Sequence, residues 1–184
     1  MSPLIEPPRA FHVVLTTYNS RTSKRMRDLG IRPGKALILD LDQEIVLTSI
    51  IRDIILENGI SCLAYNICGD HAHLVLVCHS GELSQIVKTI KGKSSFVFNK
   101  YRRASEIGNV SRLWSTKFYH GDLDKWTLSN ISNRVGWVYN DTHLGNAINY
   151  IITNRIKHNL PKSSELEMLI EEFVISVEEA FGIL

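Results

Sequence analysis

Residues 60–78 read ISCLAYNICGDHAHLVLVC, two apolar runs separated by Gly69 and Asp70. Short apolar runs bounded by a turn signal are typical of β-strands, and Gly-Asp is a dipeptide found in tight hairpins. We therefore predict a β-hairpin with strands at residues 60–68 and 71–78. The second strand begins with two histidines, so the hairpin that decides the fold also carries candidate site residues.

The segments on either side of the hairpin extend this pattern. Residues 9–18 are rich in aromatic and β-branched residues and predict a strand. Apolar residues at helical spacing predict helices over residues 42–58 and 83–103. A last strand is predicted over residues 112–119. The order β-α-β-β-α-β predicts an α+β fold with a ferredoxin-like core, in which a mostly antiparallel sheet has its helices on one face.

Two further helices are expected after this core. An apolar stripe predicts a helix over residues 141–159, which Pro161 ends, and a second amphipathic helix is expected over residues 164–181. Residues 21–34 are polar and basic and end in Pro33-Gly34, which predicts a loop or a partly ordered excursion. Residues 125–140 have no clear periodicity and are assigned neither to a helix nor to a strand.

The charge is unevenly distributed along the chain. The whole sequence has a formal net charge of +2, which by itself argues mildly against nucleic-acid binding. Residues 1–161, however, carry a net charge of +7, and residues 162–184 carry −5. Basic residues cluster in residues 21–35 and 88–103, as a surface that binds a phosphate backbone requires. The alternative is two solvated faces without a partner.

Composition excludes several other classes of protein. The chain has 184 residues, of which 44% are hydrophobic and 22% charged, enough to form a core and too few charges for disorder. No apolar run is long enough to cross a bilayer, and the first residues lack the features of a secretory signal. The three cysteines have no CxxC spacing and do not indicate a metal site. We expect a cytoplasmic protein that does not enter the membrane.

His71 and His73 form the first pair of residues that could carry chemistry. Side chains at positions i and i+2 of a strand point to the same face, about 6–7 Å apart. Two imidazoles so placed can bind one divalent cation. Residues 72, 74, 76 and 78 would then face the core. The alternative is two polar residues at a strand edge, and the pattern alone does not decide between them.

Tyr150 and Asn154 form the second pair. They are four residues apart in the predicted helix and therefore share one face, which also carries Lys157 and His158. A tyrosine can act as a covalent nucleophile, and an asparagine carbonyl oxygen can bind a hard metal ion. The alternative is a tyrosine half-buried at a helix-packing edge.

Taken together, these segments resemble the single-tyrosine HUH transposases of simple insertion sequences and the REP-associated tyrosine transposases. No single motif is specific, but five occur in the expected order over about residues 9–160. They are Phe11–Thr17, Leu63–Val75, Leu83–Gly92, Leu113-Trp114 with Lys117-Phe118, and Tyr150–Asn154 with Lys157-His158.

The resemblance implies a fold, a reaction and a site. It implies a catalytic domain over residues 1–160, with its tyrosine helix at about 142–159, and leaves an acidic C-terminal helix at 161–184 outside. His71 and His73, with Asn154, would hold a divalent metal, Mg²⁺ or Mn²⁺. Tyr150 would attack single-stranded DNA at hairpin-bearing ends. The product would be a 5′-phosphotyrosine and a free 3′-hydroxyl, from which strands can be rejoined.

The partner expected from this resemblance is single-stranded or hairpin DNA. A homodimer is expected, with a monomer as the alternative. The acidic helix is expected to pack on the domain or in a dimer, and it could also cover a basic groove. The other histidines lack paired spacing, and His12, His79, His120 and His143 are assigned structural or surface roles. The predicted phosphate contacts are Lys88, Lys91, Arg102, Arg103 and Lys157.

Two rival functions differ from this one in testable ways. A nucleotide hydrolase of the histidine-triad type also uses alternating histidines on a strand, but it would need a third histidine where Val75 stands. A domesticated relative would bind hairpin DNA without transposition activity. The presence of His71, His73, Tyr150 and Asn154 favours retained chemistry.

Overall fold

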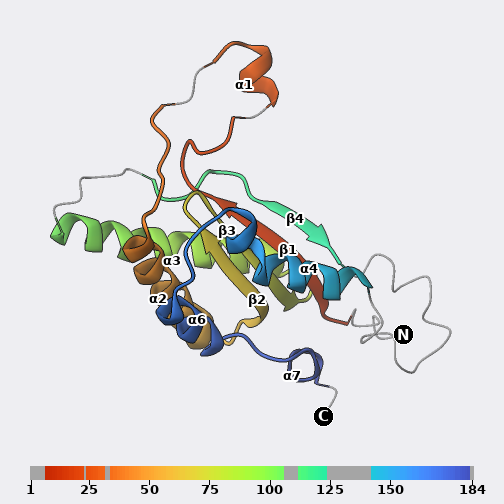
Figure 1. The fold of residues 1–184 in the computed structure, drawn as a ribbon. Helices are drawn as coiled ribbons and strands as arrows, with labels where there is room; N and C mark the ends of the chain where they lie inside the picture. Colours follow the sequence, from red (N-terminus) through yellow and green to blue (C-terminus); the bar gives the residue numbers. More distant parts are fainter. Residues whose placement is uncertain (1–6, 23, 32–33, 106–111, 124–141, 183–184) are drawn as a thin grey trace.

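A computed structural model describes residues 7–22, 24–31, 34–105, 112–123 and 142–182 of the chain (Figure 1). Four strands form one sheet: β1 (Arg9–Thr16), β2 (Ser61–Cys68), β3 (His71–Cys78) and β4 (Tyr119–Asp122). Their order is β2-β3-β1-β4, and every neighbouring pair is antiparallel. With α2 (Leu41–Glu57) and α3 (Leu83–Ala104) between strands, the order is β-α-β-β-α-β. The predicted ferredoxin-like α+β fold is confirmed.

The sheet separates two apolar layers. Side chains of β1, β2 and β3 on one face pack against α2 and α3, and this layer includes Leu47, Leu74 and Phe98. On the other face, Val75 and Val77 pack with Leu144 and Ile151 of α4 (Thr142–Ile152), and α7 (Val177–Phe181) adds its apolar side chains. The two core helices therefore lie on one face, as predicted, while C-terminal helices cover part of the other.

The C-terminal helices are shorter than the sequence pattern predicts. The helix expected over residues 141–159 is interrupted at Thr153, which separates α4 from α5 (Asn154–Lys157). At this point the Asn66 side chain on β2 donates hydrogen bonds to the carbonyl oxygens of Ile151 and Ile152, at 2.7 and 3.3 Å. These carbonyls are thereby satisfied by the sheet, and the chain can turn without leaving buried acceptors unpaired.

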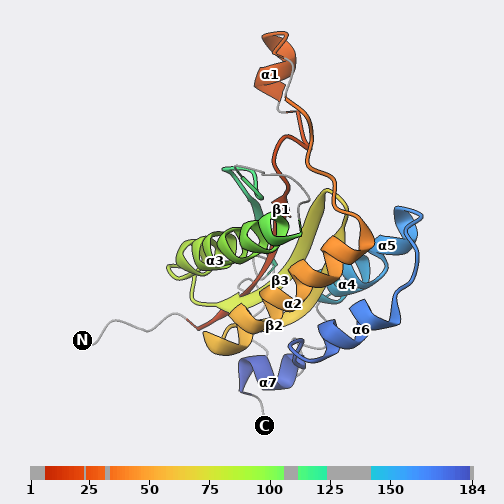
Figure 2. The same ribbon diagram turned by 90° about the vertical axis from the view of Figure 1, so that its left-hand side faces the viewer.

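The acidic segment is also divided. It forms α6 (Ser164–Glu171) and α7, and between them the Ile175 amide donates to the carbonyl oxygen of Cys62 on the edge strand β2. Figure 2 shows α2 lying between α3 and α6, and Arg52 of α2 pairs with Glu172 at 2.9 Å. The acidic segment packs on the domain, with α6 on the far side of α2 from the basic helix α3.

One other prediction of secondary structure, that of the last strand, was wrong. The last strand is at residues 119–122 instead of 112–119, and within the earlier stretch Trp114 makes one isolated bridge with Thr17. Trp114 is buried in the core although it lies in a loop, and its indole N–H donates to Ser94 of α3 at 2.9 Å. The segment at 21–34, predicted to be a loop or a partly ordered excursion, contains a short helix, α1 (Lys24–Asp28), which stands away from the sheet in both views. Residues 125–140 lie outside the described residues.

A buried ion pair joins α5 to the sheet and to α2. Glu44 of α2 is 2% exposed, and its carboxylate accepts a hydrogen bond from Arg155 at 2.6 Å and another from the Gly69 amide. Arg155 also donates to the carbonyl oxygens of Ile67 and Pro161. The pair therefore fixes α5 against the β2–β3 turn that precedes His71.

We predict that Glu44→Gln lowers the free energy of unfolding by about 3–5 kcal/mol, because it leaves the Arg155 charge buried without its partner. The matched control is Glu172→Gln, which removes the half-exposed partner of Arg52 and should cost less than about 1 kcal/mol. Urea unfolding followed by circular dichroism measures both. Equal effects of the two substitutions would contradict the role given to the buried pair.

Candidate active site

His71 and His73 lie on the face of the sheet that α4 and α5 cover. They are 3% and 5% exposed, and their rings are 4.8 Å apart between centroids. Ala72, Leu74, Leu76 and Cys78 point into the layer with α2 and α3, so the predicted alternation is confirmed. The structure places the two imidazoles side by side under the tyrosine helix.

The Nδ1 atom of His71 is already engaged. It forms a hydrogen bond with Oδ1 of Asp70 at 2.5 Å, and Arg21 in turn pairs with the other oxygen of this carboxylate at 3.3 Å. A carboxylate can only accept, so the proton lies on Nδ1 and Nε2 keeps its lone pair. This carboxylate–histidine arrangement is common behind metal-binding imidazoles.

Asn154 faces the free side of His71. It is fully buried at the start of α5, and its Nδ2 lies 3.5 Å from Nε2 of His71. Its Oδ1 is also buried, and it has no hydrogen-bond partner among the described residues. An orphaned amide oxygen in such a place costs free energy unless a ligand satisfies it. Rotating the amide about its last bond would exchange the two atoms and turn Oδ1 towards His71.

These donors fit a divalent cation. In the described part of the chain, no three His, Cys, Asp or Glu side chains are grouped so that they could hold a metal ion. A site here therefore needs the amide oxygen of Asn154 beside the two imidazoles. A set of two imidazole nitrogens and one amide oxygen can bind Mg²⁺ or Mn²⁺. It selects these ions over other divalent metals less strongly than a set of oxygen ligands would.

His12 is a residue of this cluster that the sequence did not reveal. Its Nε2 lies 2.9 Å from Nδ1 of His73, and the two rings are 5.1 Å apart. The residue lies on β1, directly opposite Val75 of β3, and thus on the same face as His73. Two histidines at positions i and i+2 of one strand can be recognised in a sequence. Whether a histidine of another strand lies beside them depends on the register of the two strands, which the sequence does not show.

Tyr150 lies beside the histidines in the same chain. Its ring centroid is 5.4 Å from that of His73 and 6.3 Å from that of His12. The side chain is 40% exposed, and the ammonium of Lys157 lies 4.0 Å from the ring centroid in a cation–π contact. Tyr150 and Asn154 thus approach the histidines from the helices that cover this face of the sheet. Tyr150 lies at the edge with solvent, and Asn154 is fully buried.

Burial lowers the pKa values of two histidines at this site, His73 and His12. Burial, together with the positive charges of His71, His12, His158 and Arg21 when these are protonated, lowers the pKa of His73 to about 3. Burial also lowers the pKa of His12. Burial opposes ionisation of Asp70, but its hydrogen bond with His71 and the nearby positive charges outweigh this and lower its pKa. A lowered pKa favours the neutral imidazole of His73, which is the state that metal binding requires.

The residues predicted to contact DNA are placed in different surroundings. Lys88 and Arg103 are exposed on α3, which lies on the face of the sheet opposite the histidines. Lys91 is half-buried and donates to the carbonyl oxygens of Ser115 and Thr116, and Arg102 is 9% exposed. Of the five, Lys157 is the one with a contact at the candidate site, where its ammonium lies over the ring of Tyr150. A DNA-binding role remains a prediction for all five.

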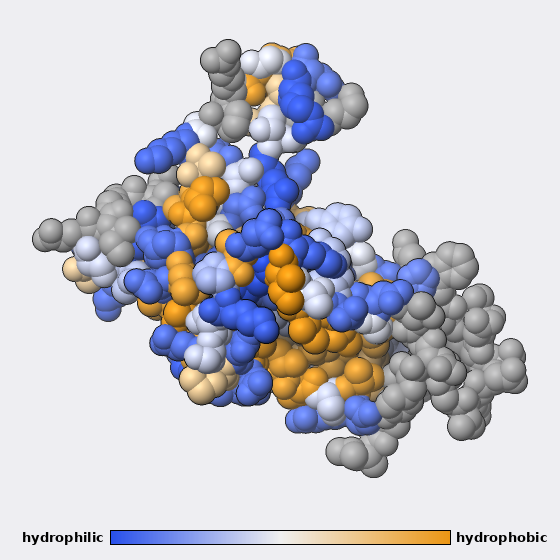
Figure 3. Space-filling view, viewed as in Figure 1, coloured by the Kyte–Doolittle hydropathy of each residue, from blue (hydrophilic) through white to orange (hydrophobic). Residues whose placement is uncertain are grey.

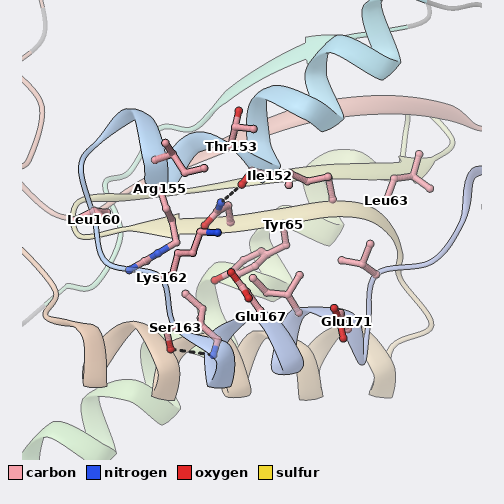
Figure 4. Close-up of a pocket in the computed structure, with 16 residues that line it drawn as sticks. Leu63, Tyr65, Ile152, Thr153, Arg155, Leu160, Lys162, Ser163, Glu167 and Glu171 are labelled. Atoms are coloured by element: carbon pink, nitrogen blue, oxygen red, sulfur yellow. Dashed lines mark hydrogen bonds between the residues drawn. The ribbon is translucent and has the colours of Figure 1, made fainter.

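A separate pocket of about 530 Å³ lies between the edge strand β2 and α6 (Figure 4). Its walls include Leu63 and Tyr65 of β2, Ile152 of α4, Arg155 of α5 and Leu166 of α6. His71, His73 and Tyr150 do not line it. Figure 3 shows the same region as an apolar area over β2, between α6 and α7. The pocket is therefore not the candidate active site.

The comparison with protein families gives the class of this protein, which is that of the transposases. The family model described as "Transposase IS200 like" matches residues 34–135, more than half of the chain. The chain therefore belongs to the IS200-like transposase family, and its role is that of a DNA-cleaving transposase. The match includes β3 with both histidines and ends before Tyr150 and Asn154.

Two solved structures are also similar to the chain. One is described as a candidate transposase from Deinococcus radiodurans R1, with 18% identity over 72% of this chain and 91% of that chain and a TM-score of 0.49. The other is a REP-associated tyrosine transposase bound to a REP hairpin, with 14% identity over 88% of this chain and 76% of that chain and a TM-score of 0.48. No curated protein matches the chain. Among the described residues, no helix is both long and apolar enough to span a membrane.

We predict that the metal-free protein loses stability below neutral pH because of His73. Its pKa is about 3 in the folded state against 6.5 in the unfolded state, so between these values the unfolded chain binds more protons. The stabilisation is present above pH 6.5 and falls by about 2 kcal/mol at pH 5. The lowered pKa of His12 acts in the same direction.

Urea unfolding at pH 7.5 and pH 5.0, in the presence of a chelator, tests this. Between the two pH values, the free energy of unfolding should fall by about 2 kcal/mol more in the wild-type protein than in His73→Asn. An identical pH dependence for both proteins would show that His73 is not held neutral in the folded state.

Proposed function

We propose that this transposase is a nickase and ligase of single-stranded DNA that uses Tyr150 as its nucleophile. The observation that supports this best is that Tyr150, His71, His73 and Asn154, whose amide oxygen has no partner among the described residues, come together within one chain. The sequence resemblance adds the expected substrate, a strand whose end carries a hairpin. The alternative is a protein that binds such DNA without cutting it.

In this proposal, Tyr150 attacks the scissile phosphorus through its phenolic oxygen. The phenolic O–H gives up its proton and a Tyr–O–P bond forms to the phosphorus, which stays on the 5′-oxygen of the downstream nucleotide. The P–O3′ bond is broken, and the departing oxygen takes up a proton as a free 3′-hydroxyl on the upstream strand. In the reverse sense, a 3′-hydroxyl attacks the phosphotyrosine and releases Tyr150. Each step exchanges one phosphodiester for another, so rejoining needs no nucleoside triphosphate.

Lys157 would position the nucleophile. Its ammonium lies over the ring of Tyr150, which also contacts the ring of His73, so the aromatic ring has two neighbours that restrict its position. The same positive charge is close enough to attract a phosphate brought to the phenolic oxygen. Tyr150 keeps 40% of its surface exposed, which leaves the oxygen accessible to a strand arriving from solvent.

The donors for a divalent cation would be Nε2 of His71, Nε2 of His73 and Oδ1 of Asn154. When bound, the cation supplies a Lewis acid that polarises the scissile phosphate. The other members of the cluster would set the protonation of these donors. Asp70 holds the proton of His71 on Nδ1, and His12 can do the same for His73 by accepting from its Nδ1.

We predict that Tyr150→Phe abolishes covalent attachment to DNA and leaves binding nearly intact. The test incubates the protein with Mn²⁺ and a labelled hairpin oligonucleotide that has single-stranded extensions, and resolves adducts on a denaturing gel. Tyr101→Phe, on α3 at the opposite face of the sheet, is the control and should form the adduct as wild type does. An adduct formed by Tyr150→Phe would assign the nucleophile elsewhere.

We further predict that His12→Ala weakens Mn²⁺ binding by roughly 10–100-fold, the range found when a partner behind a metal-binding histidine is removed. Asn154→Ala should weaken it as well. Isothermal titration calorimetry without DNA measures both. His120→Ala, which removes an exposed histidine of β4, is the matched control and should bind as wild type does. Wild-type affinity in His12→Ala would contradict the role proposed for the His12–His73 bond.

A further inference from the structure

Tyr119 on the edge strand β4 lies in the same row of the sheet as His73. Val14 of β1 is paired with Tyr119 on one side and with His73 on the other. Residues directly opposite each other in antiparallel strands point to the same face. Tyr119 therefore shares the face of the histidine cluster, two strand spacings or roughly 10 Å from His73.

This side of the face is open in the described part of the chain. The helix α4 packs against β2 and β3. Val14 and Thr16, which point to this face from β1, are half-buried, and Tyr119 is 65% exposed. A strand of DNA whose phosphate lies at Tyr150 would have the β1–β4 half of the face beside it.

The ring of Tyr119 lies against the backbone of the same strand. A Cβ built on Gly121 would come within 3.4 Å of its Oη and within 3.8 and 3.9 Å of two ring carbons. Gly121 is two residues along β4 and opposite His12, so the ring leans over the glycine towards the cluster. One side of the ring thus rests on the sheet, while the high exposure of the residue leaves the other side to solvent.

A flat, exposed aromatic ring beside a phosphate-binding site is suited to an unpaired base. Bases stack on aromatic side chains without strong sequence preference, because every base has a π-face. Two residues before Tyr119 in the chain, Lys117 is exposed and adds positive charge to the segment that leads into β4. A protein partner with an apolar surface would need a larger apolar patch than this single ring.

We propose that Tyr119 is a stacking platform for an unpaired base of the DNA strand whose phosphate lies at Tyr150. This inference rests on the proposed function, since it takes single-stranded DNA as the ligand. Stacking at this distance would fix the strand's path across β1 and β4, and so the position of the scissile phosphate relative to the nucleophile.

The test measures binding of a fluorescein-labelled hairpin oligonucleotide with single-stranded oligothymidine extensions, by anisotropy, in the Tyr150→Phe background so that no cutting occurs. Tyr119→Ala should weaken binding roughly tenfold or more, and Tyr119→Phe should restore it, because stacking needs the ring and not the hydroxyl. Phe96→Ala is the matched control: Phe96 is 74% exposed, but on α3. It should change affinity by less than about twofold.

An abasic scan of the extension identifies the stacked base. One abasic position should weaken binding to the protein that retains Tyr119 and have no further effect in Tyr119→Ala. If Tyr119→Ala binds every oligonucleotide as tightly as its parent, the stacking platform is wrong. This result is separable from failure of the proposed function, which would show instead as a lack of any covalent adduct with Tyr150 in the wild-type protein.

Discussion

The buried pair of Glu44 and Arg155 is the interaction on which the geometry of the site depends. The carboxylate of Glu44 accepts a hydrogen bond from the amide of Gly69, two residues before His71. Its partner Arg155 directly follows Asn154 in the chain. The carbonyl oxygens of Ile67 and Pro161 complete the hydrogen bonds of the guanidinium. A buried pair of charges is stabilising only when such additional bonds satisfy it. Because these bonds connect α2, the β2–β3 turn and α5, the imidazoles and the amide of Asn154 are fixed relative to one another by one network.

Much of the fold could be predicted because the hairpin at residues 60–78 has an unambiguous pattern. Its two apolar runs and Gly-Asp turn set the register, and that register puts His71 and His73 on one face with Leu74 and Leu76 on the other. The i, i+4 spacing of Tyr150 and Asn154 likewise predicted a shared helix face. The spacing survives the interruption at Thr153, because the Thr153 amide still donates to the carbonyl of Asn149 and the Lys157 amide to that of Thr153, both at the i, i+4 spacing of a helix.

The remaining features depend on contacts between segments that are distant in sequence. The end of α4 follows from Asn66 bonding the carbonyls of Ile151 and Ile152, which no local pattern encodes. Trp114 looks like a strand residue but is held in a loop by Ser94. His12 and Tyr119 join the site only through the pairing of β1 with β3 and β4. The −5 charge of the C-terminal segment gave no hint that α6 would pack on α2, away from the basic helix.

We propose that the nucleophile and the metal-binding side chains of one active site belong to the same chain. A mixing experiment tests it most directly, under conditions in which the wild-type protein forms the covalent adduct. Equal amounts of His73→Ala and Tyr150→Phe are combined with the hairpin oligonucleotide and Mn²⁺, and adduct is quantified on a denaturing gel. If each chain uses its own Tyr150 and histidines, the mixture gives no more adduct than the two variants give separately. Restoration of adduct in the mixture would contradict it, because Tyr150 of one chain would then be serving the histidines of another.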